Sequence, residues 1–502
     1  MNKLLTALKN EQNYTHTENG ALTYKSTMSA LLDMFAMGAA MRSRPEEDII
    51  VMFIKAYKED PLLALRMLFY MRDIRHNGQG ERRFFRVIIK YMANSSEYRD
   101  AIAKNMIHIP EFGRWDDLYE FAGTSLEKQA FDIMHNQFQL DMKCKTPSLL
   151  GKWLKSINTS SEKSRELGQL TRLYFGLSER NYRKALASLR AKINVVECLM
   201  SANRFDEIEF DKIPSRAGLI YKNAFARRDI IKAKYENFAK SENTTVNSKT
   251  LYPYEVVAKV IDLFKINSWY RRPDIPLDNV DRLMINKYWD NLKDYFDGAT
   301  LDALCVIDTS GSMVRSDAAA PINIATSIGL YCAERNKGPW HNTYISFSRT
   351  PRLVETDGVD FCDKVVRIVN ENLCENTNIE ATFDLILHTA LKNHLSQDEI
   401  PKTLIIISDM EFDEARQYSS ISQKTLMEQI EDKWNSFGYK MPNLIFWNVD
   451  ARHDNIPMKV KDGISFVSGC SPAIFTSIMT GKTGVDLMLE AINASCYQCI
   501  TL

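Results

Sequence analysis

Long apolar runs are missing from this sequence of 502 residues. No stretch approaches the ~18 consecutive apolar residues that a membrane-spanning helix needs. The first segment, MNKLLTALKNEQNYTH, has no apolar core of the length found in signal peptides. The nine cysteines are odd in number and scattered, which does not fit a disulfide framework. We therefore expect an intracellular, cytoplasmic protein with no membrane partner.

Motifs for enzyme chemistry are also scarce. The segment DTSGSM (308–313) has one glycine and no lysine, so it lacks the pattern of a phosphate-binding loop. Its serines do not fit the G-x-S-x-G frame of a hydrolase. Cys496 and Cys499 form a lone CxxC without a second pair, which does not predict a zinc site. No catalytic residue emerges, and we expect a protein without enzyme activity.

Net charge is zero over the whole chain, but its distribution is uneven. Lys and Arg together number 64, as do Asp and Glu. Residues 1–300 hold 47 basic and 38 acidic side chains, whereas residues 301–502 hold 17 and 26. A basic first part indicates a polyanionic partner. Two domains of opposite charge that attract each other would explain the same asymmetry, and both interpretations stay open.

The pattern of apolar residues changes near residue 298 and indicates two domains, at residues 1–297 and 298–502. The first is rich in apolar residues at helical spacing and predicts an α-solenoid or repeat-like bundle of divergent units. Its clearest helical segments are 61–74, 82–93, 148–157 and 182–202. Residues 240–250 are expected to form a loop and residues 268–279 an irregular connection.

The second domain alternates apolar runs with helical patterns. The runs cover 304–307, 343–347, 404–408, 444–449 and 464–467. The helical patterns lie around 321–335, 378–391, 421–436 and 471–479. This alternation predicts an α/β, Rossmann-like domain with a parallel sheet covered on both faces. Ligands of such sheets bind beyond the carboxyl ends of the strands.

A group of oxygen-bearing side chains follows two of these runs. Asp308, Ser310 and Ser312 come directly after residues 304–307, and Asp409 follows residues 404–408. Thr377 opens a predicted helix. Carboxylates and hydroxyls suit a hard divalent cation such as Mg²⁺. Alternatively, the serines cap helices and Asp409 lies in a solvated turn.

Asp308-x-Ser310-x-Ser312, Thr377 and Asp409 resemble the metal-ion-dependent adhesion site (MIDAS) of a von Willebrand factor type A (vWA) domain. The resemblance implies that both serines and the threonine bind Mg²⁺ or Mn²⁺, and that both aspartates act largely through water. An open position on the ion would then take an acidic residue of a partner. Asp409 lies in SDMEFDEA (408–415) rather than in the usual aspartate–glycine turn. The carboxylates that follow it could raise metal affinity or fill the open position.

The whole chain resembles the poorly characterised Ro-like (TROVE-like) family of plants, viruses and phages. The segments that carry this resemblance are 69–86, 109–121, 150–156, 182–190, 213–225 and 408–415. The resemblance implies a HEAT-like helical repeat that closes into a ring on a vWA domain. It further implies that the basic ring binds RNA, either single-stranded ends or small structured RNAs.

Basic residues near aromatic ones are the candidate RNA contacts, because cations bind phosphate and aromatic rings stack on unpaired bases. They are Arg72, Arg75, His76, Arg82, Arg83, Arg114, Lys152, Arg183, Arg216 and Lys222. Structural roles are the alternative: a polar helix face for Arg82–Arg86, and core positions for Trp115 and Trp153. The leading hypothesis is a non-enzymatic RNA-binding scaffold. The rival is a protein-interaction module, or a structural viral or phage component, that uses the metal site to bind an acidic residue.

Overall fold

Two compact units, each assembled from segments distant in sequence, make up the chain. Unit 1 comprises Met1–Ala64 and Leu251–Asn493, and unit 2 comprises Leu65–Thr250 and Ala494–Leu502. The computed structural model describes residues 3–193, 195–248, 251–266, 273–315, 317–347, 350–371, 378–414 and 424–502. In those ranges, no helix has both the length and the apolar character that a membrane crossing requires.

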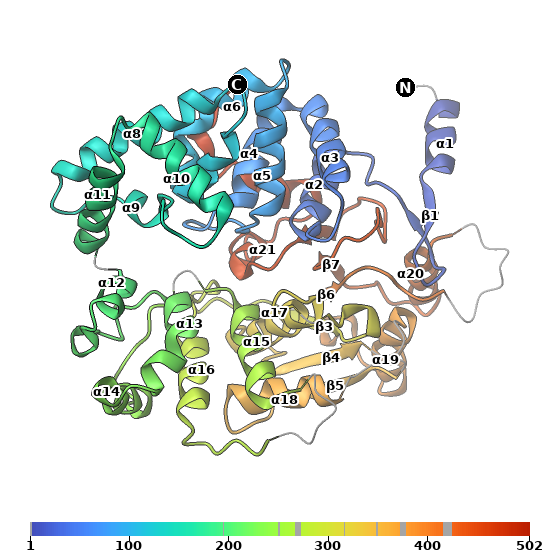
Figure 1. The fold of residues 1–502 in the computed structure, drawn as a ribbon. Coiled ribbons are helices and arrows are strands. Elements are labelled where there is room, and N and C mark those ends of the chain that lie inside the picture. The colour runs from blue at the N-terminus through green and yellow to red at the C-terminus, as the bar shows by residue number, and fades with distance from the viewer. Residues whose placement is uncertain are drawn as a thin grey trace. The chain divides into compact units, whose positions relative to one another are not determined.

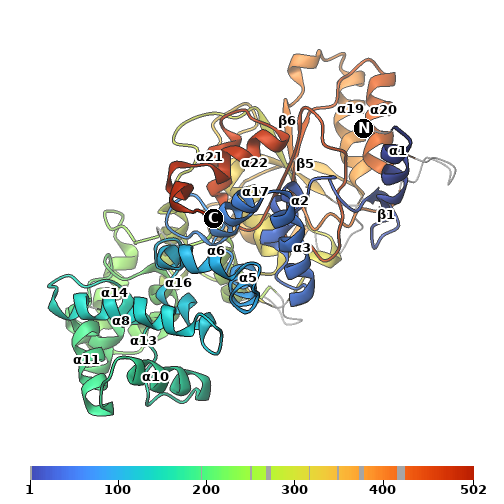
Figure 2. The ribbon, with the colours of Figure 1, turned by 90° about the horizontal axis from the view of Figure 1, so that it is seen from above.

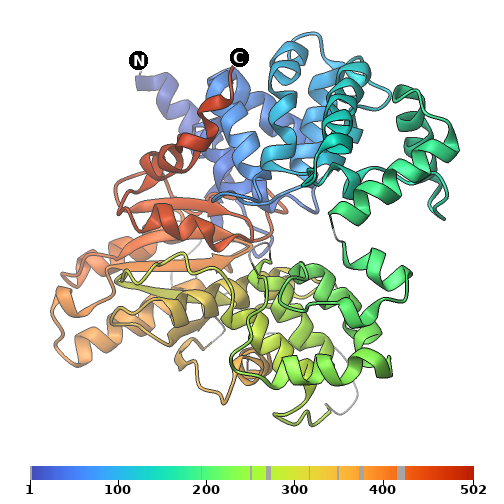
Figure 3. The same cartoon turned by 90° about the vertical axis from the view of Figure 1, so that its left-hand side faces the viewer.

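A six-stranded sheet forms the centre of unit 1 (Figure 1). Its strands are β3 (Ala303–Asp308), β4 (Thr343–Phe347), β5 (Arg352–Glu355), β6 (Thr403–Ser408), β7 (Asn443–Asn448) and β8 (Ile464–Ser468). They lie in the order β5-β4-β3-β6-β7-β8, side by side in one twisted layer (Figure 3). The five strands expected from the apolar runs are parallel neighbours. The expectation of a wholly parallel sheet is wrong at one edge, where β5 pairs antiparallel with β4.

Helices cover this sheet because its strands are apolar on both faces. Every residue of β3 is buried. α17 packs so closely on β3 that a Cβ at Gly329 would lie 2.3 Å from Ile307 Cδ1. The helices of this part of unit 1 are α15 (Pro253–Phe264), α16 (Val280–Asp290), α17 (Pro321–Arg335), α18 (Phe361–Glu371), α19 (Ile379–Lys392), α20 (Leu426–Ser436), α21 (Phe475–Ile478) and α22 (Gly484–Ile492). Helices α17, α19 and α22 pack on the strands, and α15 packs on α17.

Residues before the first long strand also belong to unit 1. They form α1 (Lys3–Gln12), the hairpin of β1 (Tyr14–His16) and β2 (Leu22–Tyr24), α2 (Ala30–Met37) and α3 (Glu46–Glu59). The Ser468 hydroxyl of β8 donates to the Phe35 carbonyl of α2 at 2.7 Å. Tyr24 and Ile456 exchange two backbone hydrogen bonds. These contacts explain why the compact units divide the chain at other places than the predicted boundary between residues 297 and 298.

Unit 2 is helical among its described residues. Its helices are α4 (Pro61–Arg72, which begins in unit 1), α5 (Arg83–Asn94), α6 (Arg99–Asn105), α7 (Ile109–Phe112), α8 (Glu127–Lys143), α9 (Leu150–Trp153), α10 (Glu162–Tyr174), α11 (Glu179–Lys192), α12 (Val196–Ser201), α13 (Ser215–Ala226) and α14 (Asp229–Lys240). Figure 2 shows α8, α10 and α11 packed together. The predicted helix 148–157 shrinks to α9, and the predicted helix 182–202 is two helices. The expected loop after residue 240 is confirmed up to residue 248.

The C-terminal segment returns to unit 2. A short 3₁₀-helix, Ser495–Cys499, carries Tyr497, which is buried. Its hydroxyl donates to Asp73 Oδ2 at 2.7 Å, and its ring stacks on Phe112. Asp73 follows α4 and is itself fully buried. This hydrogen bond therefore ties two segments of unit 2 that lie 424 residues apart.

Candidate metal centre and basic cluster

The chain reverses its direction of travel across the sheet between β3 and β6. Strands β4 and β5 lie on one side of β3, and β6, β7 and β8 lie on the other. In open α/β sheets such a switch point creates a crevice beyond the carboxyl ends of the two strands. Asp308 ends β3, and Asp409 follows β6 directly. The structure thus brings these two predicted ligands to neighbouring strand ends.

Asp308 is a completely buried carboxylate held by short hydrogen bonds. The hydroxyl of Ser408 donates to Oδ2 at 2.5 Å, and the backbone N–H of Ser310 donates to Oδ1 at 2.9 Å. Burial, followed by the charge of Asp409, raises the pKa of Asp308 from 3.8 to about 7. The carboxylates of Asp308 and Asp409 therefore repel each other at the ends of β3 and β6.

The predicted serine ligands lie in the turn after β3. Ser310 is buried, Ser312 is half-buried, and their hydroxyl oxygens are 3.1 Å apart. Between Asp308 and Ser310, the hydroxyl of Thr309 is buried without a hydrogen-bond partner. Thr377, the fifth predicted ligand, lies outside the described residues. The other four predicted ligands are thus positioned by the ends of β3 and β6.

Arginine holds the second aspartate. Arg452, which lies beyond the end of β7, places Nη2 2.8 Å from Asp409 Oδ2. A third buried carboxylate, Asp450, is paired with Arg315 at 3.0 Å. Neither arginine was predicted from the sequence. The available signal was a basic residue shortly after a strand. This signal identifies a partner of Asp409 only once the β6–β7 pairing is known.

Met410 turns the chain sharply after Asp409. It has a φ of +66°, in the left-handed region where a glycine is the usual residue. Its backbone N–H donates to the Ser408 hydroxyl at 3.0 Å. Met410 thus takes the conformation of the glycine that the resemblance led us to expect after Asp409. The side chain is buried, and packing compensates the backbone strain.

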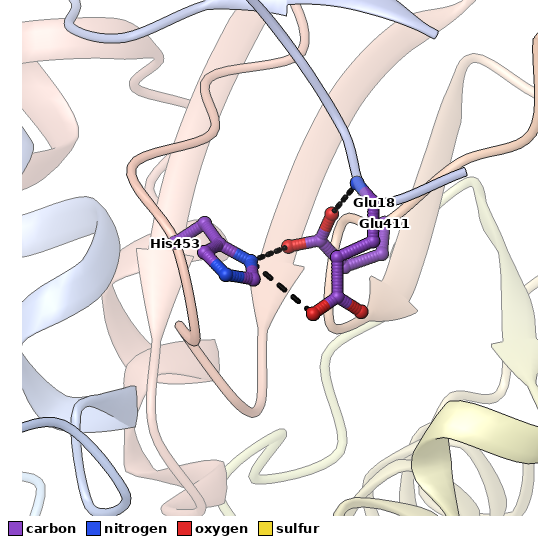
Figure 4. Close-up of side chains that lie close together, drawn as sticks. All are labelled: Glu18, Glu411 and His453. Atoms are coloured by element: carbon purple, nitrogen blue, oxygen red, sulfur yellow. Dashed lines mark hydrogen bonds and ion pairs between the residues drawn. The ribbon is translucent and has the colours of Figure 1, made fainter. Parts of the chain in front are cut away.

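The acidic run after this turn pairs with the hairpin of β1 and β2. Glu411 accepts hydrogen bonds from the backbone N–H of Glu18 at 2.7 Å and from Asn455 at 2.8 Å. His453 Nδ1 lies 3.0 Å from the same carboxylate (Figure 4). Gly20 forms a bridge with Asp413. Glu411 is therefore held by Glu18, His453 and Asn455.

A divalent cation fits the donor set at the end of β3. Asp308, Ser310 and Ser312 offer hard oxygens of the type that Mg²⁺ and Mn²⁺ prefer. Among the described residues, Asp308 has no Lys, Arg or His within ion-pair distance, whereas Asp409 and Asp450 each have an arginine. A cation beside Asp308 would offset the repulsion from Asp409 and supply the missing countercharge. Asp409 is engaged by Arg452, which suits an indirect role through water.

Arg72, a predicted RNA contact, is buried in unit 2. Its guanidinium is 2.7 Å from Asp117, which also accepts from Arg86 at 2.7 Å. Only 1% of Arg72 is exposed, which leaves it no surface for a partner. Asp116, at 3.0 Å, and Glu120, at 3.2 Å, provide further countercharges for Arg86. Arg72 and Arg86 therefore have structural positions.

Several other candidates surround Trp153. The guanidinium of Arg114 lies 4.7 Å from the centre of this ring, and the Lys152 ammonium lies 5.7 Å from it. Trp153 and Trp115 are half-buried rather than core residues. Burial, followed by the positive charge of Arg216, lowers the pKa of Arg114 to about 10. The charges of Arg72 and Arg82 act in the same direction.

We call Arg82, Arg114, Lys152 and Arg216 the basic cluster. The charges of Arg82 and Arg216 act against that of Arg114, and Asp116 acts in the opposite direction. The other predicted contacts are not part of the basic cluster. Arg75, His76 and Arg183 are exposed, and Arg83 and Lys222 are half-buried. His76 contacts Asp73, and Arg75 donates to the Pro110 carbonyl at 3.1 Å.

Net charge separates the two units more sharply than it separates the two halves of the sequence. Unit 2 contains 33 basic and 22 acidic residues, a net charge of +11. Unit 1 contains the remaining 31 basic and 42 acidic residues, a net charge of −11. The positive excess of residues 1–300 is therefore confined to unit 2.

Family comparisons match both parts of the chain. A domain of unknown function (DUF2828) matches residues 17–150 and 148–294, which is more than half of the chain. A second domain of unknown function (DUF7788) matches residues 302–495. Uncharacterized protein L728 of Acanthamoeba polyphaga mimivirus is 28% identical over 515 residues, covering 94% of this chain and 85% of that protein. The crystal structure of the Deinococcus radiodurans RO (RSR) protein aligns over 91% of this chain and 100% of its own, with 13% identity and a TM-score of 0.47.

Proposed function

This chain belongs to the family of the domain of unknown function DUF2828, and we propose that it is a non-enzymatic scaffold that binds RNA through unit 2. The observation that carries the proposal is the net charge of +11 on unit 2, the unit that contains the basic cluster. Electrostatic attraction to phosphate is the main sequence-independent term in nucleic-acid binding. The same unit offers half-buried tryptophans at positions 115 and 153 for stacking on unpaired bases.

RNA is the polyanion we favour because arginine and aromatic rings lie together. Arg114 covers one face of Trp153, and Lys152 lies near the same ring. A phosphate beside these cations would relieve the repulsion that lowers the pKa of Arg114. The Ro-like resemblance of the sequence agrees with this choice and further suggests a HEAT-like ring as the carrier.

We further propose that unit 1 contains a vWA domain that binds Mg²⁺ or Mn²⁺ through Asp308, Ser310 and Ser312, with Thr377 as an additional ligand. The ion would offset the charges of Asp308 and Asp409 and stabilise the switch point of the sheet. Support comes from the donor set and from the absence of an ion-pair partner for Asp308 among the described residues.

Binding of a single-stranded oligouridylate to the purified full chain tests the RNA proposal. We expect binding at low salt that weakens steeply between about 50 and 200 mM salt. Replacing Arg82, Arg114 and Arg216 with alanine, singly and together, should lower the affinity and flatten the salt dependence by roughly one unit of slope per arginine. Arg367→Ala is the matched control, because Arg367 is an exposed arginine of unit 1.

Two results would contradict the proposal: no binding at low salt, or an affinity that salt does not change. Asp308→Ala addresses the rival function. If this variant keeps its RNA affinity but loses a co-purifying protein, the metal site serves protein recognition instead.

A further inference from the structure

Three potential metal ligands from distant parts of the chain meet in unit 1. Glu18 lies in the turn between β1 and β2, Glu411 follows β6, and His453 follows β7 (Figure 4). One ligand atom from each lies within 4.8 Å of the other two. His453 Nδ1 is 3.0 Å from Glu411 Oε1 and 3.6 Å from Glu18 Oε1. The three side chains are separate from Asp308, Ser310 and Ser312.

The spacing of these atoms suits a small divalent cation. Nitrogen and oxygen ligands lie about 2.0–2.2 Å from Zn²⁺, so neighbouring ligands of a tetrahedral ion are about 3.3 Å apart. The two distances from His453 Nδ1 lie on either side of this value. Only small side-chain shifts would be needed for an ion to replace the present imidazole–carboxylate contacts.

Outer contacts hold both carboxylates in place. The second oxygen of Glu411 accepts from the Glu18 backbone N–H at 2.7 Å, and Asn455 donates to Oε1 at 2.8 Å. The second oxygen of Glu18 is 2.6 Å from Arg452 Nη1. Metal-binding carboxylates are commonly fixed by such hydrogen bonds from neighbouring groups. Each glutamate thus keeps one oxygen beside His453, and outer groups hold its other oxygen; the Glu411 oxygen beside His453 also accepts from Asn455.

The surroundings allow an ion to enter. Glu411 is buried, whereas Glu18 and His453 are exposed. The backbone is already closed around them: Thr17 donates to the Phe412 carbonyl at 2.7 Å, and Asn19 donates to the Glu411 carbonyl at 2.6 Å. A cation would therefore bind a largely formed site, with its remaining position open to water.

We propose that Glu18, Glu411 and His453 bind a borderline divalent cation such as Zn²⁺, and that this ion clamps the β1–β2 hairpin to the segment after β6. The imidazole sets the preference, because nitrogen ligands favour Zn²⁺ over Mg²⁺. The site is distinct from the oxygen-only site at Asp308 and does not depend on RNA binding.

Calorimetric titration of ZnCl₂ into the metal-free full chain, in excess Mg²⁺ to occupy the Asp308 site, tests the proposal. We expect His453→Ala to bind one Zn²⁺ fewer per chain than the wild type. His388→Ala, which removes an exposed histidine of α19, should bind as many as the wild type. Asp308→Ala should also retain this Zn²⁺. Asn455→Ala keeps all three ligands and should weaken binding about 10-fold.

Hydrogen exchange provides a second readout that does not depend on stoichiometry. Zn²⁺ should slow exchange of the backbone amides of residues 17–20 in the wild type and leave them unchanged in His453→Ala. Equal Zn²⁺ stoichiometry in wild type and His453→Ala would overturn the proposal. Unchanged exchange in the wild type would overturn the clamp.

Discussion

Arg452 binds Asp409 at the carboxyl end of β6, with 2.8 Å between Nη2 and Oδ2. The same guanidinium contacts Glu18 from the β1–β2 hairpin at 2.6 Å. Asp409 is only 1% exposed, so Arg452 rather than water contacts this oxygen of its carboxylate. An arginine therefore provides charge compensation for the aspartate that follows β6.

Loss of Arg452 should destabilise unit 1. Arg452→Ala leaves a buried, unpaired carboxylate, and we expect the free energy of unfolding to fall by about 3 kcal/mol. Millimolar Mg²⁺ should restore part of the loss, because an ion at Asp308 also compensates Asp409. Urea unfolding with and without Mg²⁺ measures both effects. Arg367→Ala, which breaks only an exposed ion pair, should change stability by no more than ~1 kcal/mol.

Magnesium should stabilise the wild-type protein and not Asp308→Asn. At a free concentration of 100 times the dissociation constant, one ion adds ~2.7 kcal/mol to the free energy of unfolding. Without metal, Asp308→Asn should be more stable than the wild type, because it removes the repulsion with Asp409. Thermal unfolding in EDTA and in Mg²⁺ separates these opposite effects.

Ser436→Ala, which alters the exposed last residue of α20, controls for nonspecific salt effects. A stabilisation by Mg²⁺ of the same size in the wild type and Asp308→Asn would contradict a metal site at Asp308.

Unit 2 should lose stability in acid through Asp117. Burial alone would raise the pKa of this carboxyl, but Arg72 and Arg86 hold it below 3.8. A depressed pKa contributes stability that is complete above the unfolded value and disappears as the pH falls through the folded value. Between about pH 5 and pH 3, Asp117→Asn should therefore lose less stability than the wild type.

Urea unfolding across this pH range measures the difference, with Asp132→Asn as the control, since Asp132 is a half-exposed aspartate of α8. Parallel pH profiles for wild type and Asp117→Asn would exclude this role of Asp117.

Tyr497→Phe removes one hydroxyl but should lower the stability of unit 2 substantially. The change removes only a hydroxyl, but it leaves the buried carboxylate of Asp73 without that donor. We expect a loss of about 1–3 kcal/mol in the free energy of unfolding. Tyr174→Phe removes a hydroxyl that donates to Glu127 and is the matched control in the same unit. Similar losses for both variants would show that burial of Asp73 does not matter.

The strands were the most predictable part of the fold. Buried parallel strands are apolar along their whole length, so each stands out within a short stretch of sequence. Strand β5 escaped prediction because it lies at the sheet edge and is mostly exposed, with Arg352 and Glu355 at its ends. Edge strands need no continuous apolar run, and their pairing depends on the neighbouring strand.

The candidate site was predictable where its residues are close in sequence. Asp308, Ser310 and Ser312 occur within five residues, and Asp409 follows an obvious strand. Arg452 lies 43 residues from Asp409, and the two meet only because Ser408 of β6 is in register with Asn448 of β7. The sequence around Arg452 does not predict its contact with Asp409. The β1–β2 hairpin and Glu411 are even farther apart in sequence, and their contact likewise could not be predicted without the structure.

The return of residues 494–502 to unit 2 has a consequence for biosynthesis. The ribosome makes Asp73 early and Tyr497 only after the whole sheet of unit 1 has been translated. Until then, the Asp73 carboxylate of the nascent chain lacks the hydroxyl of Tyr497 that donates to it in the folded protein. Unit 2 can therefore complete its contacts with Tyr497 only after unit 1 has been synthesised, and a chain shortened by these nine residues would never form them.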